Sequence, residues 1–181
     1  MSQNKMLLLL LALLFKISLS QTFTSITNVE SNTIQNHLNT LTFTLTPSVE
    51  IPANDIIEIT GLTGSTTYLP STNFIIYGAN AIKFGTPTAT TGTGTWTHAT
   101  GTLSLTVNAP LLINENFVII IVLRNPSSLQ TTPITPSIRT LTGATENIVS
   151  TAFPTSVLSA ATSDNYLNAS ATPTDGGRSK T

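Results

Sequence analysis

Few residues of this 181-residue chain have side chains that could do chemistry. The only two histidines, His37 and His98, lie in separate polar segments, and the chain has no cysteine. A metal or acid–base site would need partners for them, such as the acids around Glu50, Asp55 and Glu58. No metal-ligand spacing is present, and Glu50 and Asp55 flank a turn, where acids are common. We therefore interpret both histidines as solvated surface residues.

Nucleophilic catalysis has no better support. No serine lies in a Gly-x-Ser-x-Gly setting. Charged residues make up 8% of the chain, against about 25% in average soluble proteins. The net charge is −1, which argues against a nucleic-acid binder that works through basic phosphate contacts. We expect no enzymatic activity, no cofactor, no bound metal and no nucleic-acid partner.

Four side chains are candidates for binding or carrying sugars. Trp96, the only tryptophan, either stacks on a sugar ring or fills the core, and we favour the core. Tyr68 and Tyr77 are the other aromatic candidates for a carbohydrate-binding or adhesion module. Asn168-Ala169-Ser170 is the only acceptor triplet for N-glycosylation, because Pro126 follows Asn125.

The N-terminus has the three parts of a secretory signal peptide. A single lysine, Lys5, precedes the apolar run from Met6 to Phe15, and Ser18 and Ser20 stand at the positions favoured before a cut. A membrane-spanning helix needs about 20 apolar residues, and this run is too short. We expect cleavage after residue 20, a secreted, cell-surface-associated product, and no membrane span after cleavage.

The remaining sequence has a period of two, which is typical of strands. Leu41-Thr42-Phe43-Thr44-Leu45 and Thr102-Leu103-Ser104-Leu105-Thr106 alternate between apolar and hydroxyl residues. Residues 55–60 and 74–77 are shorter candidates, and Phe117–Leu123, apolar throughout, is expected to be a central strand. Turn residues separate these runs. The pattern predicts an all-β, antiparallel, immunoglobulin-like β-sandwich of about seven to nine strands.

The expected boundaries are a signal peptide over 1–20, a sandwich domain over 21–162 and a flexible polar tail over 163–181. With no cysteine in an oxidising compartment, the domain must rely on its hydrophobic core. One late strand is expected to place five residues on one face: Val149, Thr151, Phe153, Thr155 and Val157.

Several segments together resemble a module that recurs in predicted secreted and cell-surface proteins of protists. They span about 25–160 and are Asn39–Leu45, Ile51–Gly64, Gly94-Thr95-Trp96, Gly101–Val107 and Leu123-Arg124-Asn125-Pro126. The resemblance implies an extracellular β-sandwich without established enzymatic activity. The module usually occurs in tandem, whereas this chain has one copy, which leaves its link to neighbours open.

Secretion, low charge and the lack of catalytic groups favour a structural protein of the cell surface, a self-assembling subunit of a filament or coat. Net charge near zero promotes association, and exposed edge strands can pair with another chain. The candidate assembly segments are Gln21–Val29, with Gln21, Phe23 and Ile26, and Asn147–Val157, with Val149, Phe153 and Val157. The alternative is that both segments pair within their own sandwich. Expected partners are copies of the chain or other cell-surface proteins, and, in the carbohydrate-binding alternative, glycans.

Overall fold

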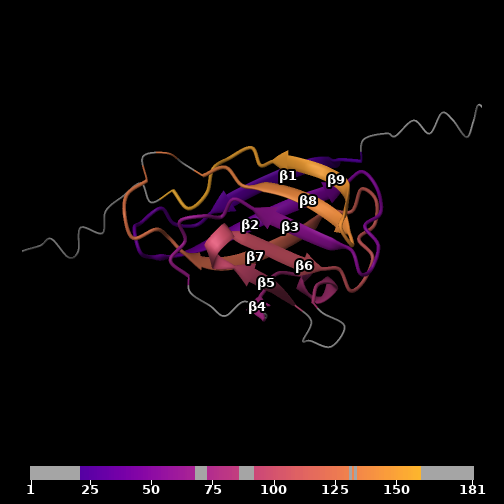
Figure 1. The fold of residues 1–181 in the computed structure, drawn as a ribbon, viewed down its shortest axis with the longest axis horizontal. Coiled ribbons are helices and arrows are strands. Elements are labelled where there is room, and N and C mark those ends of the chain that lie inside the picture. The colour runs from indigo at the N-terminus through magenta and orange to yellow at the C-terminus, as the bar shows by residue number, and fades with distance from the viewer. Residues whose placement is uncertain (1–20, 68–72, 86–91, 131, 133, 160–181) are drawn as a thin grey trace, which may run out of the picture.

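The structure, a computed structural model, describes residues 21–159 except 68–72, 86–91, 131 and 133. The expected signal peptide, the expected tail, Asn168 and Tyr68 lie outside the described residues. The described part is all-β, with two short 3₁₀ helices (Figure 1). Its strands are β1 (Phe23–Glu30), β2 (Leu38–Pro47), β3 (Ile56–Thr60), β4 (Phe74–Ile75), β5 (Thr93–Thr97), β6 (Thr102–Thr106), β7 (Phe117–Arg124), β8 (Ser137–Thr142) and β9 (Thr145–Ala152), and the helices are η1 (Ala81–Lys83) and η2 (His98–Thr100).

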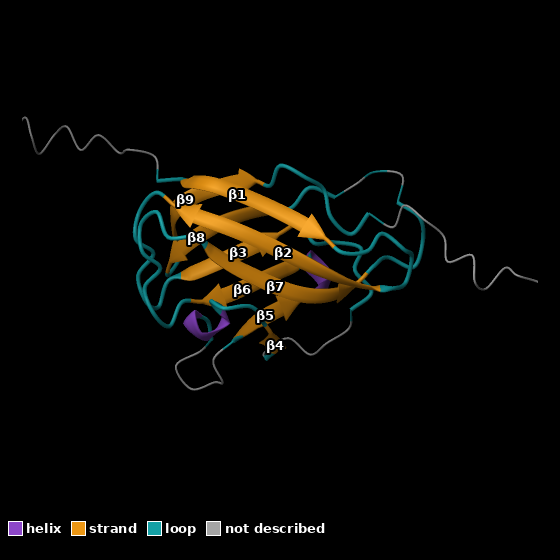
Figure 2. Cartoon of the chain, turned by 180° about the vertical axis from the view of Figure 1, so that it is seen from behind, coloured by secondary structure: helices purple, strands orange, loops and turns teal. Residues whose placement is uncertain are grey.

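The strands form two antiparallel sheets, which confirms the predicted β-sandwich. The smaller sheet has the order β1-β2-β7, and the larger one β4-β5-β6-β3-β8-β9. Figures 1 and 2 show the two layers from opposite sides. In β2, Leu41, Phe43 and Leu45 are fully buried while the threonines between them are partly exposed. The period-two pattern therefore places one face of each sheet in a shared core.

Aromatic contacts join the two layers. The ring centroids of Phe43 in β2 and Phe153, just after β9, are 4.9 Å apart. Phe84, which follows η1, lies 6.2 Å from Phe117 in β7. These distances are those of favourable tilted ring pairs. Because each pair joins segments far apart in the sequence, the core fixes how the sheets are stacked.

The central position expected for Phe117–Leu123 is wrong. This segment is β7, at the end of the three-stranded sheet, and β2 is the central strand. Its inward residues are buried, and its outward residues are only partly exposed. The chain around Gly78 covers this strand, since an added Cβ on Gly78 would lie 3.3 Å from Val118 O. Cover over an edge strand, rather than a central place in the sheet, accounts for the continuous apolar run.

The common face expected for Val149 to Val157 is also wrong. β9 ends at Ala152, and Val149 is exposed while Phe153 and Val157 are buried. The pairing of β9 with β8 shifts twice, so that residues such as Asn147 have no direct partner. Each such bulge inserts one residue and moves the following side chains to the other face.

Candidate functional site at the edges of the sandwich

Both histidines lie outside the strands. His98 begins η2, and its Nε2 is 2.8 Å from Ser65 O. His37 lies between β1 and β2, and its carbonyl accepts the N–H of Asn125 at 2.8 Å. No group of three or more His, Cys, Asp or Glu side chains within the described residues is arranged to hold a metal ion. Both histidines thus contact backbone groups of neighbouring loops.

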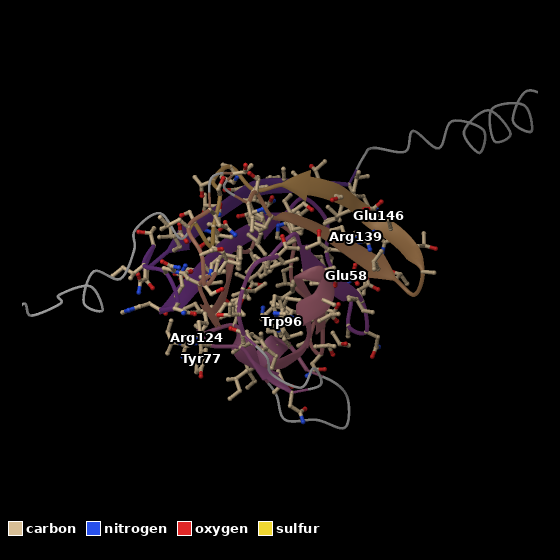
Figure 3. The ribbon with its side chains drawn as sticks, turned by 60° about the vertical axis from the view of Figure 1, so that its left-hand side comes forward. Glu58, Tyr77, Trp96, Arg124, Arg139 and Glu146 are labelled. Atoms are coloured by element: carbon tan, nitrogen blue, oxygen red, sulfur yellow. The ribbon has the colours of Figure 1, made fainter. Side chains whose placement is uncertain are left out.

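Trp96 lies in the core. It is 1% exposed, its ring centroid is 5.9 Å from that of Phe74, and its Nε1 donates to Thr67 O at 3.2 Å. Figure 3 shows the indole within the molecule, below the ion pair of Glu58 and Arg139. A buried indole presents no face to a sugar, so the core alternative accounts for Trp96. Tyr77, at 49% exposure, is the candidate aromatic that does reach the surface.

Asn39 and Asn125, from two of the segments that resemble the protist module, contact each other in a buried polar network. Asn39 and Asn125 are both fully buried, and Asn39 Nδ2 donates to Asn125 Oδ1 at 2.9 Å. Asn39 Oδ1 accepts the N–H of Ser31 at 3.0 Å and that of Asn32 at 3.2 Å. Asn125 Nδ2 donates to the carbonyls of Asn32 and Ile34, each at 2.9 Å. The network holds the connection between β1 and β2 against the end of β7, a role that their spacing did not reveal.

The outer edge of β7 is closed by loops. Tyr77 N–H donates to Ile120 O at 2.8 Å, and Ile120 N–H donates to Tyr77 O at 3.2 Å. Residues 74–77 therefore begin on the six-stranded sheet, at β5, and end on the three-stranded sheet. Two further outward N–H groups are paired, that of Val118 with Asn80 Oδ1 (2.9 Å) and that of Arg124 with Thr67 Oγ1 (2.6 Å).

On the opposite side, β1 and β9 face each other across what we call the seam, formed by residues 21–28 and 148–155. Gln21 forms a parallel bridge with Ile148. Asn28 and Thr155 exchange hydrogen bonds, with Asn28 Nδ2 donating to Thr155 O at 2.7 Å. They are 127 positions apart in the sequence, as are Gln21 and Ile148. Thr155 Oγ1 also donates to Asn28 O at 3.1 Å. The two ends of the seam thus have the same parallel offset in sequence.

The middle of the seam is open. Backbone groups of alternate residues in an antiparallel strand point to opposite sides. Ser31 N–H donates to Thr40 O on β2, so Ile26 and Asn28 point their backbone groups away from β2 and into the seam. Within the described residues, no group on the β9 side forms a hydrogen bond with the N–H or C=O of Ile26. β1 is therefore an edge strand with unpaired groups.

β9 is capped more fully than β1. Glu146 Oε1 accepts the N–H of Ser150 at 2.9 Å, and Thr151 Oγ1 donates to Val149 O at 3.0 Å. Side chains of β9 thus form hydrogen bonds with its own backbone N–H and C=O groups, which are then unavailable to a neighbouring strand. Two bulges further distort its edge, and bulges and side-chain caps are common means of preventing edge pairing.

The six candidate assembly residues divide between these strands. In the N-terminal segment, Gln21 is exposed, Phe23 is buried and Ile26 is partly buried against the core. In the C-terminal segment, Val149 is exposed, whereas Phe153 is 2% exposed and Val157 is fully buried. Val157 N–H donates to Ile134 O at 2.8 Å, and Phe153 N–H to Pro136 O at 2.9 Å. Phe153 and Val157 are thus core residues of their own sandwich and are unavailable to a neighbour.

A polar cavity of about 190 Å³ lies at the start of the seam. Asp55, 4% exposed, lines it and accepts hydrogen bonds from Thr142 Oγ1 at 2.6 Å and Asn147 Nδ2 at 3.3 Å. Gln21 and Glu50 also line the cavity. Because both Asp55 oxygens have protein donors, the carboxylate joins the loop before β3 to β8 and β9.

Ion pairs lie away from the seam. On the outer face of the six-stranded sheet, Arg139 Nε and Nη2 donate to Glu58 Oε2 at 2.8 and 2.7 Å. Lys83 Nζ donates to Glu115 Oε1 at 2.7 Å and joins η1 to the loop before β7. This hydrogen bond, with that from Leu112 N–H, lowers the pKa of Glu115.

The chain matches no protein-family model and no curated protein. The resemblance to the protist surface module therefore stays a prediction from the residues. No helix within the described residues is long and apolar enough to cross a membrane.

Proposed function

We propose that the protein is secreted after cleavage at residue 20 and is a structural protein of the cell surface that assembles with copies of itself. The three-part N-terminal sequence supports secretion. Removal of residues 1–20 takes away Lys5 and Lys16 and leaves a net charge of −3 on 161 residues. Copies with so little charge repel one another weakly, which favours assembly.

The assembly proposal depends on one observation: the sheet edges differ in how many of their outward backbone groups have hydrogen-bond partners. Loops pair with β7 at Val118, Ile120 and Arg124, and side chains of β9 bond to its own Ser150 N–H and Val149 O, whereas Ile26 in the middle of β1 has outward backbone groups that no described residue pairs. Backbone pairing along such an edge is a recognised mode of protein association. The partner that we propose is another copy of the chain, and other cell-surface proteins are the next candidates.

A carbohydrate-binding role has less support. Trp96 is buried, so Tyr77 is the candidate aromatic that the described structure leaves at the surface. Glycan-array binding that disappears in Tyr77→Ala, with the melting temperature unchanged, would favour this role. Binding that is absent from all glycans tested removes it.

The assembly proposal is tested on protein secreted from its source and on the recombinant mature chain. We expect sizing chromatography and negative-stain electron microscopy to show polymers. A synthetic peptide of residues 21–30, which supplies β1, should shorten the polymers. A peptide of residues 145–152, which supplies the capped β9, is the matched control and should have no effect. A monodisperse monomer at high concentration contradicts the proposal.

A further inference from the structure

The polar cavity at the start of the seam, which we call the seam cavity, lies at the N-terminus of the proposed mature chain. Cleavage after residue 20 makes Gln21 the first residue, and Gln21 lines this cavity of about 190 Å³. Glu50 and Asp55 line it too, and no other described residue of its lining has a charged side chain. The new terminus and two carboxylates therefore share one cavity.

The backbone nitrogen of Gln21 lies on the β9 side of its strand. Thr22 N–H donates to Ser48 Oγ at 3.0 Å, and Thr22 O accepts the N–H of Ser48 at 2.9 Å, so the groups of Thr22 point toward the end of β2. Backbone groups of successive residues in an extended chain point to opposite sides, so those of Gln21 point toward β9. The parallel bridge between Gln21 and Ile148, which also lines the cavity, has the same direction.

Asp55 is a buried carboxylate whose hydrogen-bond donors are neutral. It is 4% exposed, and Thr142 Oγ1 and Asn147 Nδ2 donate to it. A carboxylate has about four acceptor positions, so these two donors leave room for another. A buried charge is costly unless an opposite charge pairs with it. Within the described residues the basic side chains have other partners: Lys83 pairs with Glu115, Arg139 pairs with Glu58, and Arg124 Nη1 donates to Asn36 O.

We propose that the α-ammonium group of Gln21 enters the seam cavity and forms an ion pair with Asp55, so that removal of the signal peptide completes a charge pair where β1 meets β9. This inference rests on the proposed cleavage. Water hydrolyses the Ser20–Gln21 peptide bond, the Ser20 carboxylate leaves with the signal peptide, and the new amine takes up a proton near neutral pH, since the pKa of an α-amino group is ordinarily about 7.7–8.0. The uncleaved chain has an uncharged peptide N–H at this position and cannot form the pair.

Asp55, rather than Glu50, is the partner whose pairing matters for stability. Glu50 is exposed, so water screens its charge, and exposed ion pairs contribute little. Asp55 is buried, and two opposite charges attract each other more strongly where less water surrounds them. Because Asn147 also donates to Asp55, the pair joins the first residue of the mature chain to β9 through one carboxylate.

The first experiment compares the mature chain, which begins at Gln21, with a chain that begins at Ser18. The three additional residues move the ammonium group by about 10 Å. Both chains are made unmodified, with Asp55→Asn and, as the matched control, with Glu50→Gln. We expect the unmodified mature chain to melt about 3 °C or more above the longer chain. Asp55→Asn should abolish this difference, and Glu50→Gln should preserve it.

A second measurement does not require Asp55→Asn to fold. Acylating reagents react with an α-amine only in its uncharged form, and the ion pair holds the amine in its charged form. Acylation of the Gln21 amine should therefore be about tenfold or more slower in the folded mature chain than in the same chain unfolded by urea. Equal rates in the two states overturn the pair.

The outcomes separate this inference from the proposed function. A melting-temperature difference that Asp55→Asn leaves unchanged, or no difference between the two unmodified chains, overturns the pair and leaves secretion and self-assembly in place. Secreted protein in which the amine of Gln21 has displaced ammonia from its own side-chain amide, to give an uncharged lactam, also overturns the pair alone. Secreted protein that retains residues 1–20 overturns both the proposed cleavage and the pair. Mass spectrometry of the N-terminal peptide distinguishes these forms.

Discussion

Gly101 and Gly143 have almost the same left-handed backbone conformation, with φ of 59° and 60°. They differ in surroundings. A Cβ on Gly101 would lie 2.4 Å from the backbone of Leu62 and Thr63, whereas a Cβ on Gly143 would meet nothing within 4 Å. Gly101 N–H donates to His98 O at 3.2 Å and ends η2. Comparing alanine substitutions at these two glycines therefore separates the cost of the left-handed backbone from the cost of the clash with Leu62 and Thr63.

We expect Gly143→Ala to lower the free energy of unfolding by about 1–2 kcal/mol, the usual cost of a left-handed residue with a side chain. Gly101→Ala carries this cost and a backbone clash, so we expect an additional loss of roughly 2 kcal/mol or more. Urea denaturation of both variants measures the difference. Equal losses would show that the backbone of Leu62 and Thr63 moves aside freely.

The lowered pKa of Glu115 predicts a small dependence of the free energy of unfolding on pH in the acidic range. Its pKa is lowered in the folded state, chiefly by the hydrogen bond from Lys83, then by that from Leu112 N–H. A carboxyl with a lowered folded pKa contributes stability above its unfolded pKa and loses it as pH falls through the folded value. The pH range in which this stability is lost therefore begins near the ordinary pKa of 4.5 and extends below it.

In Lys83→Met we expect a smaller loss of stability on going from neutral pH to below 4.5 than in the unmodified chain. The effect should be small, because the carboxylate is exposed and water screens the pair. Melting temperatures across this range test it, with Arg139→Met as a comparison for a second ion pair. Identical pH profiles for Lys83→Met and the unmodified chain would contradict the assignment.

At the scale of the elements, the bulges mark the strands that end the sheets on the seam side. The β1–β2 ladder contains one register shift, and the β8–β9 ladder contains two. The β2–β7 ladder is regular along its length. A bulge leaves a residue without a partner and twists the strand, so the irregular ladders should open more easily than the regular one.

Hydrogen exchange on monomeric protein measures this difference. Amides of β1 that bond to β2, such as that of Thr27, should exchange at least about tenfold faster than those of Phe43 and Ile119 in the regular ladder. The comparison within one sheet controls for temperature and intrinsic rate. Equal protection of β1 and β2 would contradict the expected effect of the bulge between Phe23 and Ser25.

At the scale of the molecule, the low charge predicts how assembly responds to salt. Strand pairing and apolar packing depend little on charge, and the mature chain has a net charge of only −3. We expect the concentration for half-maximal assembly to change by no more than about twofold between roughly 0.02 and 0.5 M salt. Light scattering over this range is the measurement. A steep dependence would indicate charged contacts between copies.

The sequence by itself determined the class of the fold. Alternation in Leu41–Leu45 and Thr102–Thr106 follows from the geometry of an extended strand, in which successive side chains point to opposite faces, so it is readable locally. The same pattern identified the buried residues of these strands, whereas the preference for a buried Trp96 came from the resemblance carried by Gly94-Thr95-Trp96. It could not place β7 at an edge or find the network of Asn39 and Asn125.

Only the tertiary structure decided which groups are available at the edges. The seam joins Gln21 to Ile148 and Asn28 to Thr155 across 127 positions, and no local pattern encodes that register. The bulge near Val149 puts Val149 and Phe153 on different faces, because an inserted residue reverses the alternation beyond it. Availability for pairing depends on which strands become neighbours, and packing of the whole core sets that.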